Sequence, residues 1–386
     1  MKKILIIILT IVLSISLKAQ NSAEKIIAEN EGLHIGGYGQ IDFNLQSRDG
    51  TIHENGKLDV HRLVTFFGYN FNDKASFVSE VEFEHVTEVY VEQAFLDYKI
   101  KNNLSVNAGL MLIPMGIQNL YHEPPTFNGV ERTNVDKYIV PTTWREMGIG
   151  LSGRSMRQSL NYQLMMVNGF NGYDGGGVFS GKSGLRSGRQ KGAESYITFP
   201  DFAGRVSYYG QPDLNLGLSA YMGDSESKAY DGLDLSNEEA VASADSTIIG
   251  IQMIGIDARY TKGALQLRGQ YIIANISNTN QYNALTGKDL GSKMTGYYVE
   301  LGYNFLANFN TSNELIGFSR YENYNTHAEV ESAEIINDAY NRTDVTFGLG
   351  FKVAQGAMFK MDYQIMTNDA SEDSKGQFNF GTAIWF

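Results

Sequence analysis

The sequence contains no cysteine, which excludes disulfide bonds and thiolate chemistry. Basic residues are in the minority, with 31 Lys and Arg against 43 Asp and Glu. The resulting net charge of −12 argues against nucleic acid or an anionic membrane surface as a partner. Proline is scarce at 6 residues, whereas Gly, Tyr and Phe are frequent at 41, 23 and 21.

Long apolar runs are also absent, apart from one at residues 4–17. This run follows two lysines and precedes Ala19, which predicts a secretory signal peptide at residues 1–19. No later segment is apolar enough for a spanning helix, so any membrane residence must come from strands that alternate in polarity. We expect residues 20–33 to form a short periplasmic segment and residues 34–386 to form the folded domain. An exported chain without disulfides fits a protein that crosses the periplasm unfolded.

From His34 onward, apolar side chains recur at every second position. In residues 104–112, for example, apolar side chains alternate with small or polar ones. Side chains at i and i+2 share one face of a strand, so each such segment has one apolar and one polar face. We count sixteen of these segments. They lie near 34–44, 60–71, 75–86, 90–100, 103–113, 146–152, 159–168, 201–210, 213–223, 248–261, 263–274, 294–305, 313–324, 342–353, 357–367 and 376–386.

The connections between these segments alternate in length. Tight turns alternate with long connections at 114–145, 169–200, 224–246, 275–293 and 325–341. The pattern predicts an all-β fold, a 16-stranded antiparallel transmembrane β-barrel with short periplasmic turns and long external loops. Because an open edge in lipid would leave backbone groups unpaired, the last segment must pair with the first. Outward aromatic residues near the short-turn ends are predicted to form an interfacial girdle: Phe71, Tyr98, Tyr208, Tyr260, Phe305 and Phe351.

Residues 33–44, 61–84 and 91–116, together with the terminal Phe386, resemble the porin O and P family. That family is named for phosphate-selective porins and is common in Bacteroidetes-type outer membranes. The resemblance implies a sixteen-stranded barrel, usually trimeric, with a loop folded into the pore. It also implies that Phe386 is the assembly signal recognised by the barrel-assembly machinery.

Charged side chains on the inward faces are the strongest functional signal. Glu80, Glu82 and Glu84 alternate along one strand, so their carboxylates share the face opposite Phe77 and Phe83. Two interpretations remain open: a transverse field that orders permeating ions, or cross-strand ion pairs that only solvate the pore. Because acidic and basic groups nearly balance, no dense basic ladder suited to phosphate is visible. The predicted pore-lining residues are Arg62, Glu80, Glu82, Glu84, Arg205, Arg259, Arg268, Arg320, Lys352 and Lys360.

The connection at 114–145 holds four of the six prolines, which reduce the freedom of its chain. A stable constriction inside a wide barrel would need such stiffness. An external cap or a subunit contact is the alternative. The predicted constriction residues are Tyr121, His122, Glu123, Glu131, Arg132, Asp136 and Lys137.

Other motifs carry little chemistry. Residues 176–183 fit a nucleotide-binding G-x4-G-K-[ST] pattern, but no helical pattern follows, so a flexible external loop is expected instead. The six histidines are scattered, and we expect no catalytic set, cofactor or metal site. The acidic connection at 224–246 lacks calcium-loop spacing and is expected to be a solvated loop.

These observations predict a porin of the bacterial outer membrane rather than an enzyme. We expect passive diffusion of small hydrophilic solutes or ions, with phosphate or other anions among the candidates, through a water-filled barrel. Membrane lipid would surround a homotrimer. The alternative is a barrel plugged by its loops that acts as a surface adhesion or interaction protein.

Overall fold

The computed structural model describes residues 31–52, 54–331 and 334–386. The predicted signal peptide and most of the predicted periplasmic segment lie outside these residues. No helix of the described chain is long and apolar enough to cross a membrane.

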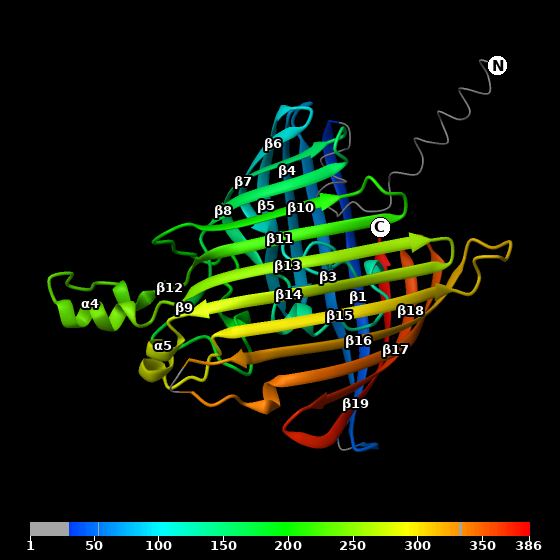
Figure 1. The fold of residues 1–386 in the computed structure, drawn as a ribbon. Coiled ribbons are helices and arrows are strands. Elements are labelled where there is room, and N and C mark those ends of the chain that lie inside the picture. The colour runs from blue at the N-terminus through cyan, green and yellow to red at the C-terminus, as the bar shows by residue number, and fades with distance from the viewer. Residues whose placement is uncertain (1–30, 53, 332–333) are drawn as a thin grey trace.

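Sixteen long antiparallel strands form one closed sheet, as Figure 1 shows. Each strand pairs with its neighbours in sequence, and the last strand, β19, pairs with the first, β1. The predicted strand number, antiparallel order and closure are therefore confirmed. The strands are β1 (Gly32–Arg48), β3 (Lys57–Asn70), β4 (Ala75–Glu84), β5 (Glu88–Lys101), β6 (Leu104–Leu112), β7 (Arg145–Ser155), β8 (Leu160–Val167), β10 (Asp201–Tyr208), β11 (Leu214–Asp224), β13 (Gly250–Lys262), β14 (Leu265–Ser277), β15 (Lys293–Asn304), β16 (Glu314–Glu329), β17 (Asn341–Ala354), β18 (Ala357–Asn368) and β19 (Ser371–Trp385).

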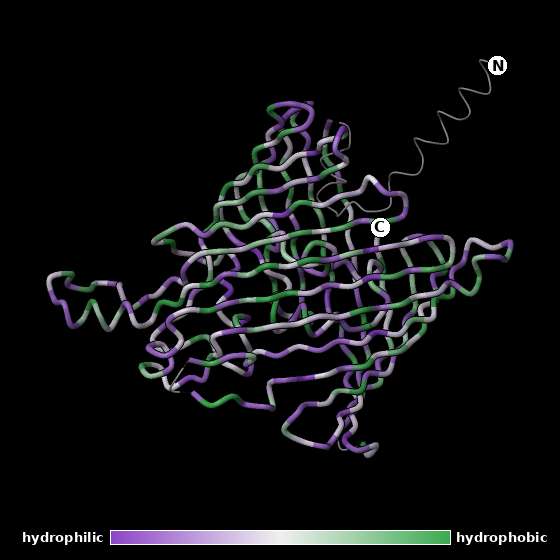
Figure 2. The backbone as a smooth tube through the Cα atoms, in the orientation of Figure 1, coloured by the Kyte–Doolittle hydropathy of each residue, from purple (hydrophilic) through white to green (hydrophobic). Residues whose placement is uncertain are grey.

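The barrel places apolar side chains outside and polar ones inside. On β17, Val345, Phe347, Leu349 and Phe351 are 38–49% exposed, whereas Asp344 and Thr346, at the alternate positions, are buried. Figure 2 shows this alternation along the strands as successive changes of hydropathy. Such an outer surface is stable in lipid, where apolar faces need no covering protein layer. Of the predicted girdle residues, Tyr260 is partly buried and the others are exposed.

The chain terminus completes the barrel. The backbone N–H of Phe386 donates to the Gly37 carbonyl, and the Gly37 N–H donates to the Phe386 carbonyl, both at 2.9 Å. A Cβ on Gly37 would lie 2.5 Å from the Val64 carbonyl oxygen and 3.0 Å from the Phe386 ring. Glycine is therefore required where β1 approaches both neighbours closely.

Short helices and strands lie at the long-loop end of the barrel. The two-residue strand β2 (Thr51–Ile52) extends the β1–β3 hairpin, and β9 (Asn171–Tyr173) pairs in parallel with β12 (Glu226–Ser227). The helices α4 (Glu238–Asp245) and α5 (Thr279–Thr286) also lie here, and α4 projects away from the barrel (Figure 1). Two further 3-10 turns are η3 (Lys228–Tyr230) and η4 (Asp338–Tyr340).

Two predicted loops are more ordered than expected. The acidic connection at 224–246 contains α4, which begins where the Asn237 side chain accepts a hydrogen bond from the Ala240 N–H. The segment at 176–183 is not a free loop, because Phe179 is fully buried and its N–H donates to the Tyr282 hydroxyl. Only the three-residue 3-10 turn η2 (Arg186–Gly188) follows, so the helix that a phosphate-binding loop needs is missing from this part of the described chain.

A pair of glycine variants tests the close approach at the barrel seam. Gly37→Ala should lower the stability of the folded barrel by about 1–3 kcal/mol, because the backbone must move to admit the methyl group. Gly39→Ala is the matched control, since its Cβ would meet atoms only at ordinary contact distances of 3.5 and 3.6 Å. Unfolding in urea can be monitored by the heat-modifiable gel mobility of the barrel. Equal urea concentrations at the unfolding midpoint for the two variants would contradict this explanation.

Candidate functional site

Residues 113–144, which connect β6 to β7, lie inside the barrel; we call them the inserted loop (Figure 1). The loop contains the 3-10 turn η1 (Pro124–Thr126) and the short helix α3 (Val135–Tyr138). Hydrogen bonds join it to β1, β14, β15, β16 and β18. β16 lies about halfway around the sixteen-strand barrel from β6 and β7, so the loop crosses the lumen.

A buried lysine holds the first half of the inserted loop. The Lys360 ammonium donates to the carbonyls of Phe127 and Gly129 at 2.6 and 2.9 Å and also to that of Pro124. It lies 4.0 Å from the centroid of the Phe127 ring. Three charge-assisted hydrogen bonds use all the donors of the ammonium group, so loop carbonyls take the place of the water that would otherwise solvate it.

Carboxylates of the wall hold the second half. Glu322 on β16 accepts the N–H groups of Asn134 and Val135 at 2.6 and 3.1 Å, where α3 begins. Asp362 on β18 accepts the Val130 N–H at 2.6 Å, and Glu300 on β15 accepts from the Asn128 amide at 2.9 Å. The bonds to Glu322 and Asp362 satisfy backbone N–H groups that an inserted loop would otherwise leave unpaired, whereas Glu300 binds the Asn128 side chain.

Apolar contacts fix the loop against a second segment, residues 168–200. The Trp144 ring stacks on Phe170, with centroids 4.6 Å apart, and meets Tyr221 of β11 edge-on at the same distance. The inward faces of β13 and β14 are apolar at their long-loop ends, where Ile251 and Ile272 are fully buried in the same cluster. The expectation of a polar inner face along every strand is therefore wrong at this end, because the loops bring apolar side chains to cover it.

Most predicted pore-lining charges are paired within the wall. The ion pairs, with their N···O distances, are Arg62–Glu82 at 2.6 Å, Arg205–Asp257 at 2.7 Å, Lys352–Glu314 at 3.0 Å, Arg268–Glu300 at 3.2 Å, Arg320–Glu300 at 3.4 Å and Arg320–Glu322 at 3.4 Å. Arg259 instead lies 4.0 Å above the Tyr121 ring. Glu80 is buried, and Glu84 lies 4.0 Å from the His85 ring. This arrangement favours the second interpretation, cross-strand ion pairs, for most of these residues.

The predicted constriction residues all lie on the inserted loop, and several bond to the wall or within the loop. Glu131 accepts from the Asn44 amide at 3.0 Å, and Asp136 accepts from that of Gln270 at 2.9 Å. Burial raises the pKa of Asp136 to about 6. Within the loop, Arg132 donates to the His122 carbonyl, and the Lys137 ammonium lies over the Tyr138 ring. Two other residues contact the wall: His122 faces Glu92, and Tyr121 lies under Arg259. Glu123 is buried.

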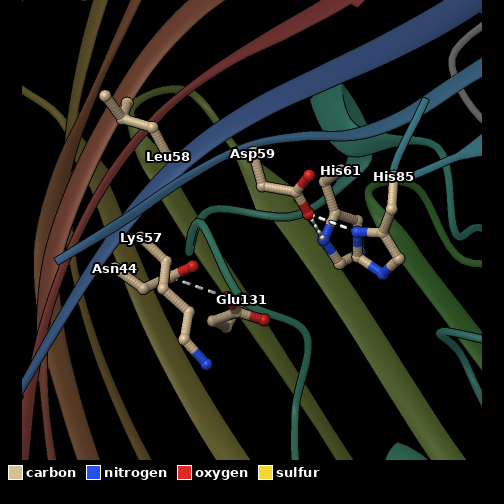
Figure 3. Close-up of a pocket in the computed structure, with 7 residues that line it drawn as sticks. All are labelled: Asn44, Lys57, Leu58, Asp59, His61, His85 and Glu131. Atoms are coloured by element: carbon tan, nitrogen blue, oxygen red, sulfur yellow. Dashed lines mark hydrogen bonds and ion pairs between the residues drawn. The ribbon is translucent and has the colours of Figure 1, made fainter. Parts of the chain in front are cut away.

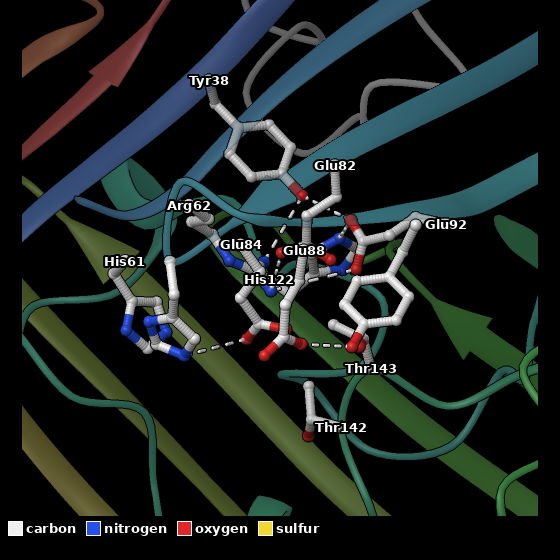
Figure 4. Close-up of polar contacts among 12 residues, drawn as sticks. Tyr38, His61, Arg62, Glu82, Glu84, Glu88, Glu92, His122, Thr142 and Thr143 are labelled. Atoms are coloured by element: carbon white, nitrogen blue, oxygen red, sulfur yellow. Dashed lines mark hydrogen bonds and ion pairs between the residues drawn. The ribbon is translucent and has the colours of Figure 1, made fainter. Parts of the chain in front are cut away.

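Glu92 belongs to a buried cluster that strand periodicity does not predict (Figure 4). It accepts from the Tyr38 hydroxyl at 2.8 Å and lies 3.3 Å from His122 and 3.9 Å from Arg62. The pairing of β4 with β5 shifts by one residue here, so Glu92 lies in a β-bulge. A bulge turns a side chain that should point outward toward the lumen, and no sequence pattern marks it.

The start of β7 and the segment at 168–200 supply a basic cluster that was not predicted: Arg145, Arg186, Arg189 and Lys191. The Arg189 guanidinium donates to the carbonyls of Thr142 and Thr143 at 3.0 and 3.3 Å. The Lys191 ammonium lies 4.7 Å from the Tyr90 ring centroid. Burial, followed by the neighbouring Arg189 and Arg145, lowers the pKa of Lys191. Among the ion pairs of the described residues, none includes a member of this cluster.

A cavity of about 570 Å³ remains between the inserted loop and the first strands (Figure 3). Its lining comes from β1, β3, the turn after β4 and the inserted loop: Asn44, Lys57, Leu58, Asp59, His61, His85 and Glu131. The prediction that the histidines are scattered is wrong for two of them, because the ring centroids of His61 and His85 are 5.5 Å apart. The pairing of β3 with β4 brings these two histidines together, although they are 24 positions apart in sequence.

The sequence matches a known family and a distant relative. The family model described as phosphate-selective porin O and P matches residues 33–319. An uncharacterized protein of Aquifex aeolicus (strain VF5) is 31% identical over 351 residues, which cover 89% of this chain and 77% of that protein.

Several solved structures share the fold. The outer membrane channel DcaP of Acinetobacter baumannii aligns with a TM-score of 0.62 at 10% identity, covering 95% of this chain and 99% of its own. An anion-selective porin from Comamonas acidovorans aligns with a TM-score of 0.60 at 12% identity, covering 92% and 99%. OmpT of Vibrio cholerae, in its trimer form, aligns with a TM-score of 0.52 at 12% identity, covering 92% and 100%. At these identities the likeness concerns the fold alone.

Removing the buried ammonium tests whether it retains the inserted loop. In Lys360→Met, the carbonyls that it satisfies lose their donor, and the loop should leave the lumen part of the time. Trypsin, which is too large to enter the barrel, should then cut at Arg132 or Lys137, whereas the parent protein stays intact.

Lys352→Met is the matched control, because it removes a partly exposed ion pair worth less than about 1 kcal/mol. Equal protease resistance of the two variants would show that Lys360 does not retain the loop.

Proposed function

Since the chain belongs to the phosphate-selective porin O and P family, we propose that it is an outer-membrane porin. Small hydrophilic solutes and ions, with anions favoured, diffuse through it passively, and no covalent chemistry is involved. In this proposal residues 1–19 are a signal peptide, the barrel is surrounded by lipid, and three copies form a trimer. Phe386 is the signal for the barrel-assembly machinery.

One observation carries the proposal: an inserted loop is fixed inside a closed barrel and still leaves a polar cavity beside the wall. The loop covers the apolar inner faces of β13 and β14 but borders a cavity of about 570 Å³ on the side of β1 and β3. The lining of this cavity carries charged side chains from both the wall and the loop, such as Asp59 and Glu131. Pore width and lining charge then select the permeating solutes.

We assign the anion preference to the basic cluster of Arg145, Arg186, Arg189 and Lys191, whose charges lie together in the lumen. The wall carboxylates Glu82, Glu300 and Glu322 are each neutralised by an arginine. Arg186 and Arg189, in contrast, donate to backbone carbonyls, which leaves their positive charge uncompensated. A local positive field raises the concentration of small anions at the constriction.

A plugged barrel that acts as a surface interaction protein is the second candidate. The tight aromatic packing of the inserted loop against residues 168–200 closes part of the lumen, and α4 projects outward from the barrel. Both features suit a surface receptor as well as a narrow pore.

Electrical recording distinguishes the two candidates. The refolded protein in a planar bilayer should give ohmic current steps that close in three equal sublevels, one for each subunit of a trimer. A correctly folded barrel that stays silent over many insertions would overturn the porin proposal and favour the surface protein.

The reversal potential in a salt gradient tests the source of the anion preference. Replacing both arginines, in Arg186→Gln/Arg189→Gln, should lower the anion-to-cation permeability ratio severalfold, because the uncompensated charges are removed. Arg157→Gln, in the exposed short turn after β7, is the control and should leave the ratio unchanged. An unaltered ratio in the double variant would assign selectivity to other groups.

A further inference from the structure

Two histidines and one aspartate face one another at the edge of the cavity (Figure 3). The pairing of β1 with β3 shifts register between Asp59 and Arg62, and at this β-bulge Asp59 and His61 both turn toward the cavity. His85 comes from the turn after β4, where its backbone N–H donates to the His61 carbonyl at 3.3 Å. One nitrogen or oxygen atom from each of the three side chains lies within 4.8 Å of the other two.

The three side chains are close to the spacing of metal ligands. The His85 Nδ1 contacts the Asp59 Oδ2, and the His61 Nδ1 lies 4.0 Å from that same oxygen. The ligand atoms of a tetrahedral zinc site are about 3.3 Å apart, because each lies about 2.0–2.2 Å from the ion.

A further carboxylate lies beside one of the histidines. Asp42 is 1% exposed, and its Oδ2 lies 3.5 Å from the His61 Nδ1. Its other oxygen, Oδ1, has no hydrogen-bond partner among the described residues. Asp42 faces the same ring nitrogen as Asp59 and adds a carboxylate to the edge of the cluster.

From this geometry we propose that Asp59, His61 and His85 bind a divalent transition-metal ion, represented by Zn²⁺. Two imidazoles and one carboxylate suit zinc, copper or nickel, whereas calcium and magnesium prefer all-oxygen sites. The three side chains are 29–46% exposed, so an ion can enter from the cavity. A fourth coordination position stays open for water or for a passing anion.

The buried cluster of Glu80, Glu92 and His122 is the weaker candidate for the same ion. Its side chains are covered, and the Arg62 guanidinium already lies 3.9 Å from Glu92. A second positive charge there would be repelled by the arginine. Arg62 and Arg132 also lie near His61, but neither forms an ion pair with Asp59, the only carboxylate of the exposed cluster.

Isothermal titration of the refolded, detergent-solubilised chain with Zn²⁺ tests the proposal near neutral pH. One ion should bind per chain, and excess Ca²⁺ should not displace it. His61→Gln and His85→Gln, which keep polar side chains of similar size, should each weaken binding tenfold or more. His34→Gln, near the opposite end of β1, is the matched control and should bind as the parent does. Co²⁺ should give the visible absorption of a tetrahedral site in the parent and lose it in the His85→Gln variant.

Two results would overturn the proposal. One is binding that survives unchanged in the His61→Gln/His85→Gln double variant, and the other is binding that is lost only in His122→Gln. Heat-modifiable gel mobility establishes that each variant is folded before titration. Because the titration needs no current, its outcome is independent of whether the barrel conducts.

Discussion

The ammonium group of Lys360 lies inside the barrel and donates its hydrogen bonds to backbone carbonyls of a loop rather than to a carboxylate. An isolated buried charge is costly, so the lysine and the three loop carbonyls need one another. Wall carboxylates such as Glu322 and Asp362 bind the N–H groups of the same loop. Together these bonds turn a stretch of chain without regular structure into a fixed part of the lumen. The narrowness, charge and cavity of the barrel all depend on that placement.

The division of charge follows from the same constraint. Inside the wall, arginines and carboxylates on neighbouring strands pair across the sheet, so they contribute little net field. Arg186 and Arg189, which enter on a loop, donate to backbone carbonyls and form no ion pair with a carboxylate, so their field remains. We therefore assign the positive field of the pore to these loop residues, while the strands provide a closed support with an apolar outer surface.

The architecture was predictable because each barrel strand repeats with period two and each connection length is visible in the sequence. Residues 376–386 have the alternation of a strand with one apolar face and end on an aromatic residue. Because the sheet must close, the first strand was their only possible partner. The lumen was less predictable. The inward position of apolar residues such as Ile272 is explained by the loops that cover them, and the sequence does not show where those loops lie. Glu92 was hidden by a bulge, and His61 and His85 meet only through strand pairing.

The central claim is that the inserted loop lies across the lumen in the native, membrane-embedded protein. The cysteine-free chain permits a direct measurement, since Asn134→Cys/Asp344→Cys introduces the only two thiols, where the Asn134 amide now donates to the Asp344 carboxylate. Treatment with a short thiol cross-linker should join them and change the gel mobility of the unfolded chain, as a loop fixed against β17 requires. Failure to cross-link in a barrel that is folded and inserted would place the loop outside the lumen and contradict the account.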